Sequence, residues 1–295
     1  MAEVEIFQSC QQAATMTETA LTSEFFPTTS GTKTHYTTCG NPSGQLLITL
    51  HGLGGSSKTF EPLLPKLPLD RYRVVSVDFE GFGKTLTTSK PASVARYVSD
   101  LDDLITHLQR SSPESLVSKP VVIIGHSVGA IVALHYAATK PDNVAGLSLL
   151  GVSRSASHIE AARERMLGMA NRARSEGIGP LADLAMTTNF PEDTPQDTRL
   201  EVRKAVASSD LEGYAKTWEA MASPEHVDPE YGRIVCPCVF VTGEKDTISP
   251  PTKAKEVSGL LGGISKVEIV KGGHQPILSD LDGTAAALEW LFERI

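Results

Sequence analysis

Short apolar runs, each closed by glycine or a polar residue, recur along the chain. They are rich in β-branched and aliphatic residues, and the run at 46–50, followed by His51-Gly52, is typical of them. Near-continuous apolar runs of this kind indicate parallel strands buried on both faces. The sequence therefore predicts six strands, at residues 46–50, 73–77, 121–124, 144–150, 239–241 and 266–270.

Between these runs, apolar positions recur at intervals of three and four residues, which indicates amphipathic helices. Clear cases are 93–110, 280–294 and 129–139, the last being apolar nearly all round and therefore buried. Strands that alternate with helices predict an α/β fold with a mostly parallel central sheet flanked by helices. Residues 22–40 add two strands around the turn at Ser30-Gly31, which we expect to begin the sheet in antiparallel fashion.

One stretch breaks this alternation. It contains no predicted strand, and four helices follow one another there, at 159–173, 179–186, 197–207 and 211–221. We therefore expect a helical insertion at 153–233, set into a core made of 21–152 and 234–295. Residues 1–20 are rich in Gln and Thr and predict a peripheral N-terminal segment.

The composition narrows the class of protein. Of the 295 residues 40% are apolar, which supplies a sizeable core and argues against a disordered chain. The 35 acidic and 27 basic residues give a net charge of −8, so neither nucleic acid nor an anionic membrane is an expected partner. No apolar run is long enough to span a bilayer, and the N-terminus does not resemble a signal peptide. We therefore expect a cytoplasmic protein, a monomer or a homodimer.

The cysteines are few: Cys10, Cys39, Cys236 and Cys238. A single residue separates Cys236 from Cys238, which fits neither a CxxC redox pair nor a zinc knuckle. We expect reduced, structural thiols. The sequence predicts no metal site and no organic cofactor.

The strongest chemical signal is Gly125-His126-Ser127-Val128-Gly129, a G-x-S-x-G pattern with a predicted strand before it and a predicted helix after it. In that context the glycines permit a sharp, strained turn that lifts the serine hydroxyl clear of the sheet. A serine hydroxyl is a weak nucleophile and needs a base held by a third group. The sequence therefore predicts Ser127 as a nucleophile with partners further along the chain.

Two later loops carry candidates for these partners. Asp246 follows the predicted strand at 239–241, and His274 follows the strand at 266–270. Both positions lie at carboxyl ends of strands, where open α/β sheets place their sites. We expect His274 to act as general base and then acid, and Asp246 to orient its imidazole. Glu244 is the alternative acid, but the shorter and later carboxylate fits the loop better.

A third element is the glycine-rich loop His51-Gly52-Leu53-Gly54-Gly55, directly after a predicted strand. A tetrahedral acyl-transfer intermediate carries an oxyanion that needs preorganised donors. We expect the backbone N–H groups of Leu53 and of Val128 to supply them. The loop has neither the GxGxxG nor the GK[ST] pattern of a phosphate cradle.

These three motifs, in this order, resemble the α/β-hydrolase fold superfamily over residues 22–295. The loop Asp78-Phe-Glu-Gly-Phe-Gly83 is similar to the D-x-x-G-x-G loop of many members, although Glu80 stands where arginine is frequent and Thr85 where serine is frequent. The resemblance implies that the insertion is a cap over the active site. Short stretches, among them 165–183 and 243–251, resemble the branch of 3-oxoadipate enol-lactonases and small-molecule esterases.

Substrate choice is expected to depend on the insertion. Trp218 is the first candidate for lining an apolar pocket, together with Met166, Met169, Leu184, Met186, Phe190 and Met221. Four arginines, Arg163, Arg165, Arg172 and Arg174, form either a solvated helix face or a site for a substrate carboxylate. The remaining histidines outside the motifs, His35, His107, His135, His158 and His226, are expected to be satisfied or solvated.

The sequence thus predicts a serine hydrolase that cleaves a carboxylic ester or lactone of a small molecule through an acyl-enzyme on Ser127. Because Ser127 is not an aspartate, haloalkane dehalogenases and epoxide hydrolases are disfavoured. Four alternatives stay open: a carbon–carbon bond hydrolase, an acyltransferase or cyclase, a proline-releasing peptidase, and a slow-turnover receptor. Ring state, pathway and exact substrate are not fixed by the fold.

Overall fold

A computed structural model describes residues 20–114, 117 and 119–295 of the chain. Its centre is a sheet of eight strands in the order β1-β2-β4-β3-β5-β6-β7-β8. The first three strands in the chain are β1 (Thr22–Pro27), β2 (Lys33–Gly40) and β3 (Gln45–Leu50). The other strands are β4 (Tyr72–Val77), β5 (Val121–His126), β6 (Val144–Leu150), β7 (Cys238–Gly243) and β8 (Ser265–Val270).

The strand directions confirm the expected sheet. β1 pairs with β2, and β2 with β4, in antiparallel fashion, whereas every pair from β4 to β8 is parallel. All six predicted parallel strands are present, and the hairpin at 22–40 begins the sheet at one edge. Parallel strands end at the same edge of the sheet, so the loops after β3, β5, β7 and β8 come together.

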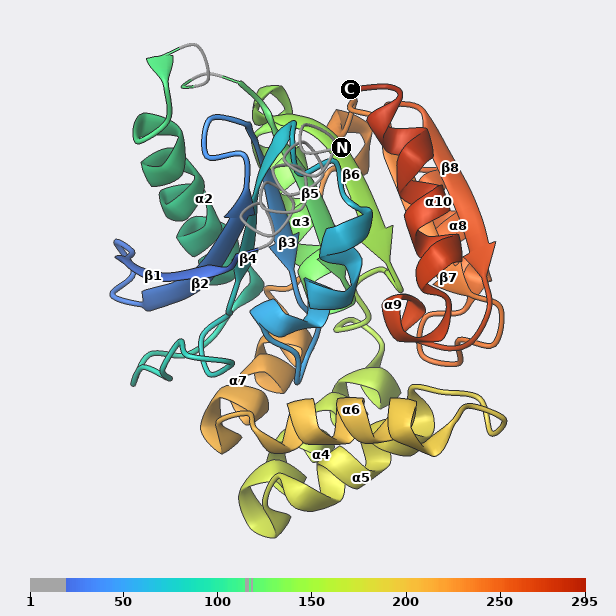
Figure 1. Ribbon diagram of the computed structural model, residues 1–295. Helices are drawn as coiled ribbons and strands as arrows, with labels where there is room; N and C mark the ends of the chain where they lie inside the picture. Colours follow the sequence, from blue (N-terminus) through green and yellow to red (C-terminus); the bar gives the residue numbers. More distant parts are fainter. Residues whose placement is uncertain (1–19, 115–116, 118) are drawn as a thin grey trace, which may run out of the picture.

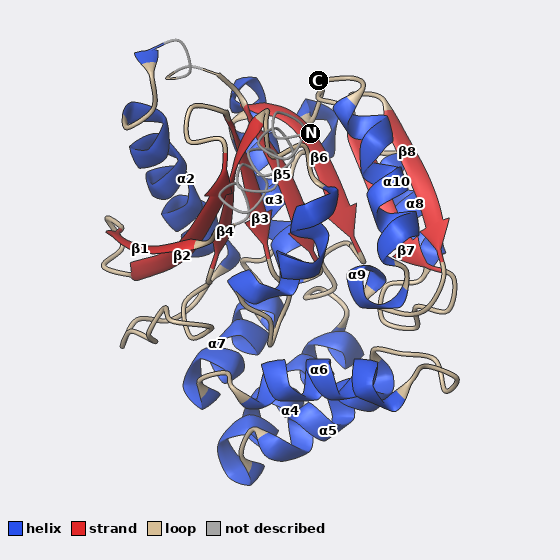
Figure 2. Cartoon of the chain, in the orientation of Figure 1, coloured by secondary structure: helices blue, strands red, loops and turns tan. Residues whose placement is uncertain are grey.

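Helices cover both faces of the sheet (Figures 1 and 2). Adjacent strand residues face opposite layers, as the two-residue period of a strand requires. Ile48 and Ile123 pack in the layer of α2 (Val94–Arg110), α3 (Val128–Thr139) and α8 (Pro251–Ser258). Leu47 and Val122 pack on the opposite side, against η1 (Ser57–Lys66), α9 (Pro276–Ser279) and α10 (Leu281–Phe292).

Four inserted helices form a separate layer beyond the carboxyl ends of the parallel strands (Figure 1). They are α4 (Glu160–Glu176), α5 (Gly179–Thr188), α6 (Gln196–Ala207) and α7 (Leu211–Ala222). α4 packs against α7, and α5 packs against α6. These helices match the four predicted between β6 and β7, while the division of the chain into separate domains stays a prediction.

Sequence reasoning missed three elements and two short turns. η1, α8 and α9 contain or follow prolines, and the first two lie in segments without a clear helical period. The two short turns, η3 (Pro141–Asn143) and η4 (Tyr231–Arg233), are single 3₁₀ turns.

Cys39, Cys236 and Cys238 are buried and free, whereas Cys10 and nearly all of the expected N-terminal segment lie outside the described residues. Within the described ranges, no helix is both long and apolar enough to cross a bilayer.

Candidate active site

Ser127 occupies a strained turn between β5 and α3. Its φ of 51° and ψ of −113° make it the one non-glycine residue of positive φ among the described residues. The flanking glycines make the turn possible. A Cβ on Gly129 would lie 2.1 Å from the Leu50 carbonyl oxygen, and a Cβ on Gly125 would lie 2.6 Å from the Gly129 carbonyl oxygen. The local sequence therefore places this hydroxyl at the N-terminus of α3, as predicted.

The predicted partners of Ser127 lie beside it. His274 Nε2 is 3.1 Å from Ser127 Oγ, and His274 Nδ1 is 2.8 Å from Asp246 Oδ2. Asp246 Oδ1 accepts hydrogen bonds from the backbone N–H groups of Ile248 and Ser249, each at 2.8 Å. The tertiary fold thus joins three residues, each just after a strand, into one hydrogen-bond chain.

The Asp246 carboxyl is held in its ionised form. Burial opposes ionisation, but the hydrogen bond and charge of His274 and the two backbone N–H groups outweigh it. The pKa of Asp246 is therefore below its usual value. An ionised Asp246 keeps a proton on Nδ1 of His274, which leaves Nε2 to accept the Ser127 hydroxyl proton. Glu244, the alternative acid, is exposed on the same loop and makes no contact of this kind.

His126, the residue directly before Ser127, contacts the backbone of His274. Its Nε2 lies 2.8 Å from the carbonyl oxygen of His274. Burial and the charge of His274 lower the pKa of His126 to about 3, so the ring is neutral and donates from Nε2. The backbone N–H of His274 also donates to the Asn189 carbonyl at 2.8 Å. Neither contact was predicted, because neither has a spacing signature in the sequence.

His51 fixes the glycine-rich loop. Its Nε2 accepts from the Phe79 N–H at 3.0 Å, so the ring proton is on Nδ1, which donates to the Gly52 carbonyl at 2.7 Å. Burial lowers the pKa of His51 and keeps the ring neutral. Because a peptide unit is planar and trans, holding the Gly52 carbonyl turns the Leu53 N–H the opposite way.

The two amides expected to bind an oxyanion have no partner of their own. In the described part of the chain, neither the Leu53 nor the Val128 N–H donates a hydrogen bond. The loop also lies against the serine, because a Cβ on Gly52 would be 3.0 Å from the Cβ of Ser127. Both N–H groups are therefore available beside Ser127.

A cavity of about 520 Å³ lies between this site and the inserted helices. Ser127 and His274 form part of its wall, and each inserted helix contributes residues that recur at intervals of three or four, with Leu184 and Ala185 adjacent, so that they share one side of the helix. The helix contributions are Arg165 and Met169 (α4), Leu181, Leu184, Ala185 and Thr188 (α5), Val202 and Val206 (α6), and Tyr214 and Trp218 (α7).

The expectations for pocket lining are only partly met. Met169, Leu184 and Trp218 line this cavity. Met166, Met186, Phe190 and Met221 do not, which corrects the sequence analysis for these four. Met166 and Met186 each follow a lining residue, Arg165 and Ala185 respectively, without lining the cavity themselves. Phe190 is instead buried in the core.

A second cavity of about 460 Å³ lies between the glycine-rich loop, η1, α6 and α9. Leu53, His126 and Gln275, with two valines of α6, line both cavities. Its wall contains Glu61 and Glu201 as well as lysines. The site is thus flanked by two chambers that share one wall.

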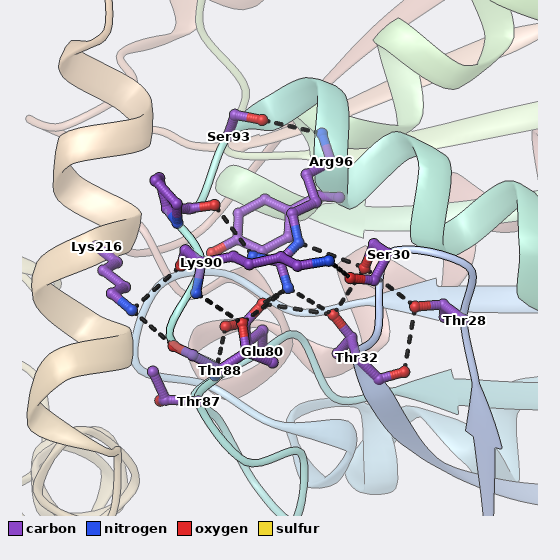
Figure 3. A network of polar contacts seen from close by, with 12 residues as sticks. Thr28, Ser30, Thr32, Glu80, Thr87, Thr88, Lys90, Ser93, Arg96 and Lys216 are labelled. Atoms are coloured by element: carbon purple, nitrogen blue, oxygen red, sulfur yellow. Dashed lines mark hydrogen bonds and ion pairs between the residues drawn. The ribbon is translucent and has the colours of Figure 1, made fainter.

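The inserted helix α7 is fixed to the core by a polar network (Figure 3). Glu80 and Arg96 form a buried ion pair at 2.6 Å, and Glu80 also accepts from the Thr88 N–H at 2.7 Å. Lys216 of α7 donates to the backbone carbonyls of Thr88 and Lys90, at 2.7 and 3.1 Å. Glu80, the departure from the common loop pattern, therefore helps to position the helix that carries Tyr214 and Trp218.

A second Ser–His–Asp chain occurs at the edge of the sheet. His35 Nδ1 lies 2.6 Å from Asp78 Oδ2, and His35 Nε2 lies 2.7 Å from Ser23 Oγ. His35 is thus satisfied, as expected. Asp78 also accepts from the N–H groups of Ser57 at 2.5 Å and Lys84 at 2.9 Å.

Among the described residues, no group of three or more His, Cys, Asp or Glu side chains could hold a metal ion.

Residues 47–287 match the alpha/beta hydrolase family. The chain belongs to that family. The match spans the parallel strands on either side of the insertion and the inserted helices themselves, so this hydrolase has the fold that its motifs predicted.

Curated relatives of this hydrolase include several activities. It is 27% identical over 253 residues to the proline iminopeptidase PfmaB of Pestalotiopsis fici, covering 78% of this chain and 85% of that protein. It is 26% identical over 250 residues to the pimeloyl-[acyl-carrier protein] methyl ester esterase of Neisseria meningitidis, covering 80% and 89%. It is 25% identical over 219 residues to the 3-oxoadipate enol-lactonase 2 of Acinetobacter baylyi, covering 73% and 76%.

Among solved structures, a thermophilic esterase from Thermogutta terrifontis superposes with a TM-score of 0.81 at 24% identity. The superposition covers 92% of this chain and 98% of that one. At this identity the likeness concerns the fold. The relatives place this chain among hydrolases with esterase and lactonase members, which is coarser than a substrate.

Proposed function

We propose that this alpha/beta hydrolase is a serine hydrolase that cleaves a carboxylic ester or lactone of a small molecule. The observation that carries the proposal is the hydrogen-bond chain Ser127–His274–Asp246 in the wall of a 520 Å³ cavity. A serine hydroxyl is activated when one imidazole nitrogen faces it and the other is hydrogen-bonded to a buried, ionised carboxylate. Ser127, in its strained turn, stands in this arrangement.

The reaction proceeds in two halves. Ser127 Oγ attacks the substrate carbonyl while its proton passes to His274 Nε2, and His274 then gives that proton to the leaving alkoxide oxygen. The acyl group remains as an ester on Ser127. Water attacks this ester with His274 as base, and the carboxylic acid and free serine result. Asp246 stabilises the imidazolium that forms in each half.

The amides of Leu53 and Val128 stabilise the tetrahedral oxyanion in both halves. Support comes from their unpaired N–H groups and from the contact of Gly52 with Ser127. His51 is a positioning residue here, since it holds the Gly52–Leu53 peptide by its carbonyl.

A panel of lactones, short-chain aryl esters and prolyl amides, read by proton or chromophore release, tests the proposal. We expect many turnovers on at least one ester or lactone, and a loss of at least about 10⁴-fold for Ser127→Ala. Turnover of prolyl amides alone would favour a peptidase, in line with one curated relative. Full activity of Ser127→Ala would overturn the assignment. Stoichiometric labelling without turnover would favour a receptor or an acyltransferase.

A further inference from the structure

The rim of the main cavity carries positive charge without a matching carboxylate. Two cations, Arg165 of α4 and Lys253 of α8, line the cavity and are also exposed, so they lie at its rim. No Asp or Glu is among the lining residues of that cavity. Resting on the function proposed above, we infer that the substrate is an ester or lactone whose other end carries a carboxylate.

The other arginines of the predicted cluster are engaged elsewhere. Arg172 pairs with Glu176 at 3.0 Å, and Arg174 pairs with two glutamates of α7. Arg163 donates to the Ala222 carbonyl at 3.3 Å. Arg165 alone of the four lines the cavity, and within the described ranges its side chain makes no ion pair and no hydrogen bond. The structure thus selects one arginine where the sequence left the whole cluster open.

The charge of the rim is particular to this chamber. The chain has a net charge of −8, so a wall with two cations and no carboxylate runs against its general composition. The second cavity is balanced, because Glu61 and Glu201 stand beside Lys58 and Lys204, and Lys204 pairs with Glu201 at 2.9 Å. Of the two chambers, only the one that contains Ser127 and His274 offers unbalanced positive charge.

The wall of the chamber that holds this rim is otherwise mainly apolar. Met169, Leu181 and Leu184 supply much of that lining. Trp218 adds a buried indole N–H that has no hydrogen-bond partner in the described part of the chain. A molecule that fits this wall has a short apolar spacer between its reactive carbonyl and its carboxylate. Arg165 recognises that carboxylate best, because a guanidinium can bind it through two parallel hydrogen bonds.

The test compares monomethyl adipate with methyl hexanoate, which has the same chain but no carboxylate. We expect kcat/KM of the unaltered enzyme to be about tenfold higher for the charged ester. Arg165→Gln should remove that preference by raising KM for monomethyl adipate about tenfold relative to KM for methyl hexanoate, measured on the same variant. Arg172→Gln is the matched control, since Arg172 lies on the same helix, has 43% of its side chain exposed and does not line the cavity.

A binding measurement separates this inference from the proposed function. Adipate should bind Ser127→Ala, measured by calorimetry, and Arg165→Gln in that background should weaken its binding about tenfold. Equal kcat/KM for both esters, with no effect of Arg165→Gln, would overturn the inference and leave the hydrolase function standing. Absence of turnover with Arg165-dependent adipate binding would overturn the function and support the anion site. No adipate binding would overturn the inference in either case.

Discussion

Two Ser–His–Asp chains occur in this molecule, and their hydrogen bonds alone do not tell them apart. In Ser127–His274–Asp246 the two distances are 3.1 and 2.8 Å. In Ser23–His35–Asp78 they are 2.7 and 2.6 Å, which are the shorter contacts. Both histidines and both aspartates are buried. If hydrogen-bond length alone decided, Ser23–His35–Asp78 at the edge of the sheet, here called the edge chain, would be chosen as the catalytic set.

The surroundings of the two serines differ. Ser127 stands in a strained turn at a helix N-terminus and lines a cavity, and the backbone amides of Leu53 and Val128 donate no hydrogen bond to any described residue. Ser23 is exposed on the edge strand β1, lines neither cavity, and accepts a hydrogen bond from Lys84 Nζ at 3.1 Å. Acyl transfer requires a bound carbonyl and a stabilised oxyanion as well as a base. These differences support the proposal that the first chain, and not the second, is the catalytic one.

The edge chain has a structural task instead. Asp78 accepts hydrogen bonds from two backbone N–H groups, one of Ser57 in η1 and one of Lys84 in the loop after β4. The next residue, Phe79, donates its N–H to His51, and Glu80 begins the network that holds α7. The second chain thus fixes the loops that position the first.

Replacing the two serines separately gives the largest contrast. Ser127→Ala should lower kcat/KM on the preferred ester at least about 10⁴-fold, because the nucleophile is lost. Ser23→Ala should change it less than about twofold, because that hydroxyl contacts His35 and Lys84 and lines neither cavity. Steady-state kinetics on the same substrate measures both. A large loss from Ser23→Ala would show that the edge chain takes part in the reaction.

The two aspartates should differ in what they affect. Asp246→Asn should lower kcat about 10³- to 10⁴-fold with little loss of stability, because the wrong tautomer of His274 then faces Ser127. Asp78→Asn should mainly lower the free energy of unfolding, by about 2–4 kcal/mol, because a buried carboxylate that accepts several hydrogen bonds is lost. Urea unfolding beside kinetics separates the two effects. Equal losses of kcat in both variants would contradict the division of tasks.

The loop after β4, which Asp78 of the edge chain holds, packs against α7, and we expect it to affect substrate binding through that helix. A Cβ on Gly213 of α7 would lie 2.3 Å from the Cα of Gly81, so Gly213→Ala pushes this helix away from the core. We expect KM to rise about three- to tenfold with kcat nearly unchanged, since Trp218 moves while Ser127 does not. Gly168→Ala in α4 is the matched control, because no atom lies within 4 Å of its added Cβ. Kinetics unaffected by Gly213→Ala would show that the position of α7 is unimportant for binding.

The smallest expected effect is a change in acid stability. The pKa of His126 is about 3 in the folded protein, below the value of about 6.5 in an unfolded chain. Its contribution to stability is therefore complete above about pH 6.5 and is lost as the pH falls from there toward 3. His126→Gln should lose less stability than the unaltered protein between pH 7 and pH 5, measured by urea unfolding. The exposed His158→Gln should behave like the unaltered protein.

Much of the fold could be predicted because its signals are local. Five of the six predicted parallel strands and the helix α3 follow from runs whose apolar residues are nearly all buried, whereas the edge strand β8 was found from its pattern although Ile269 is 50% exposed. The proline-containing η1 and α8 were missed because their helical form depends on packing against the sheet. The supporting contacts of His126 with His274, and of Glu80 with Arg96, join residues that are far apart along the chain or have no fixed spacing.

The sequence by itself determined the turn at Ser127 and the order in which Asp246 and His274 follow it. The glycines of the turn and the ends of the strands can be recognised from neighbouring residues alone. Only the tertiary structure decided which of two Ser–His–Asp chains faces a cavity, which of four arginines lines it, and which methionine of α4 does so. These outcomes depend on the rotation of each helix about its axis and on where distant segments meet. In α4, Met169 is among the residues that line the cavity and Met166 is not.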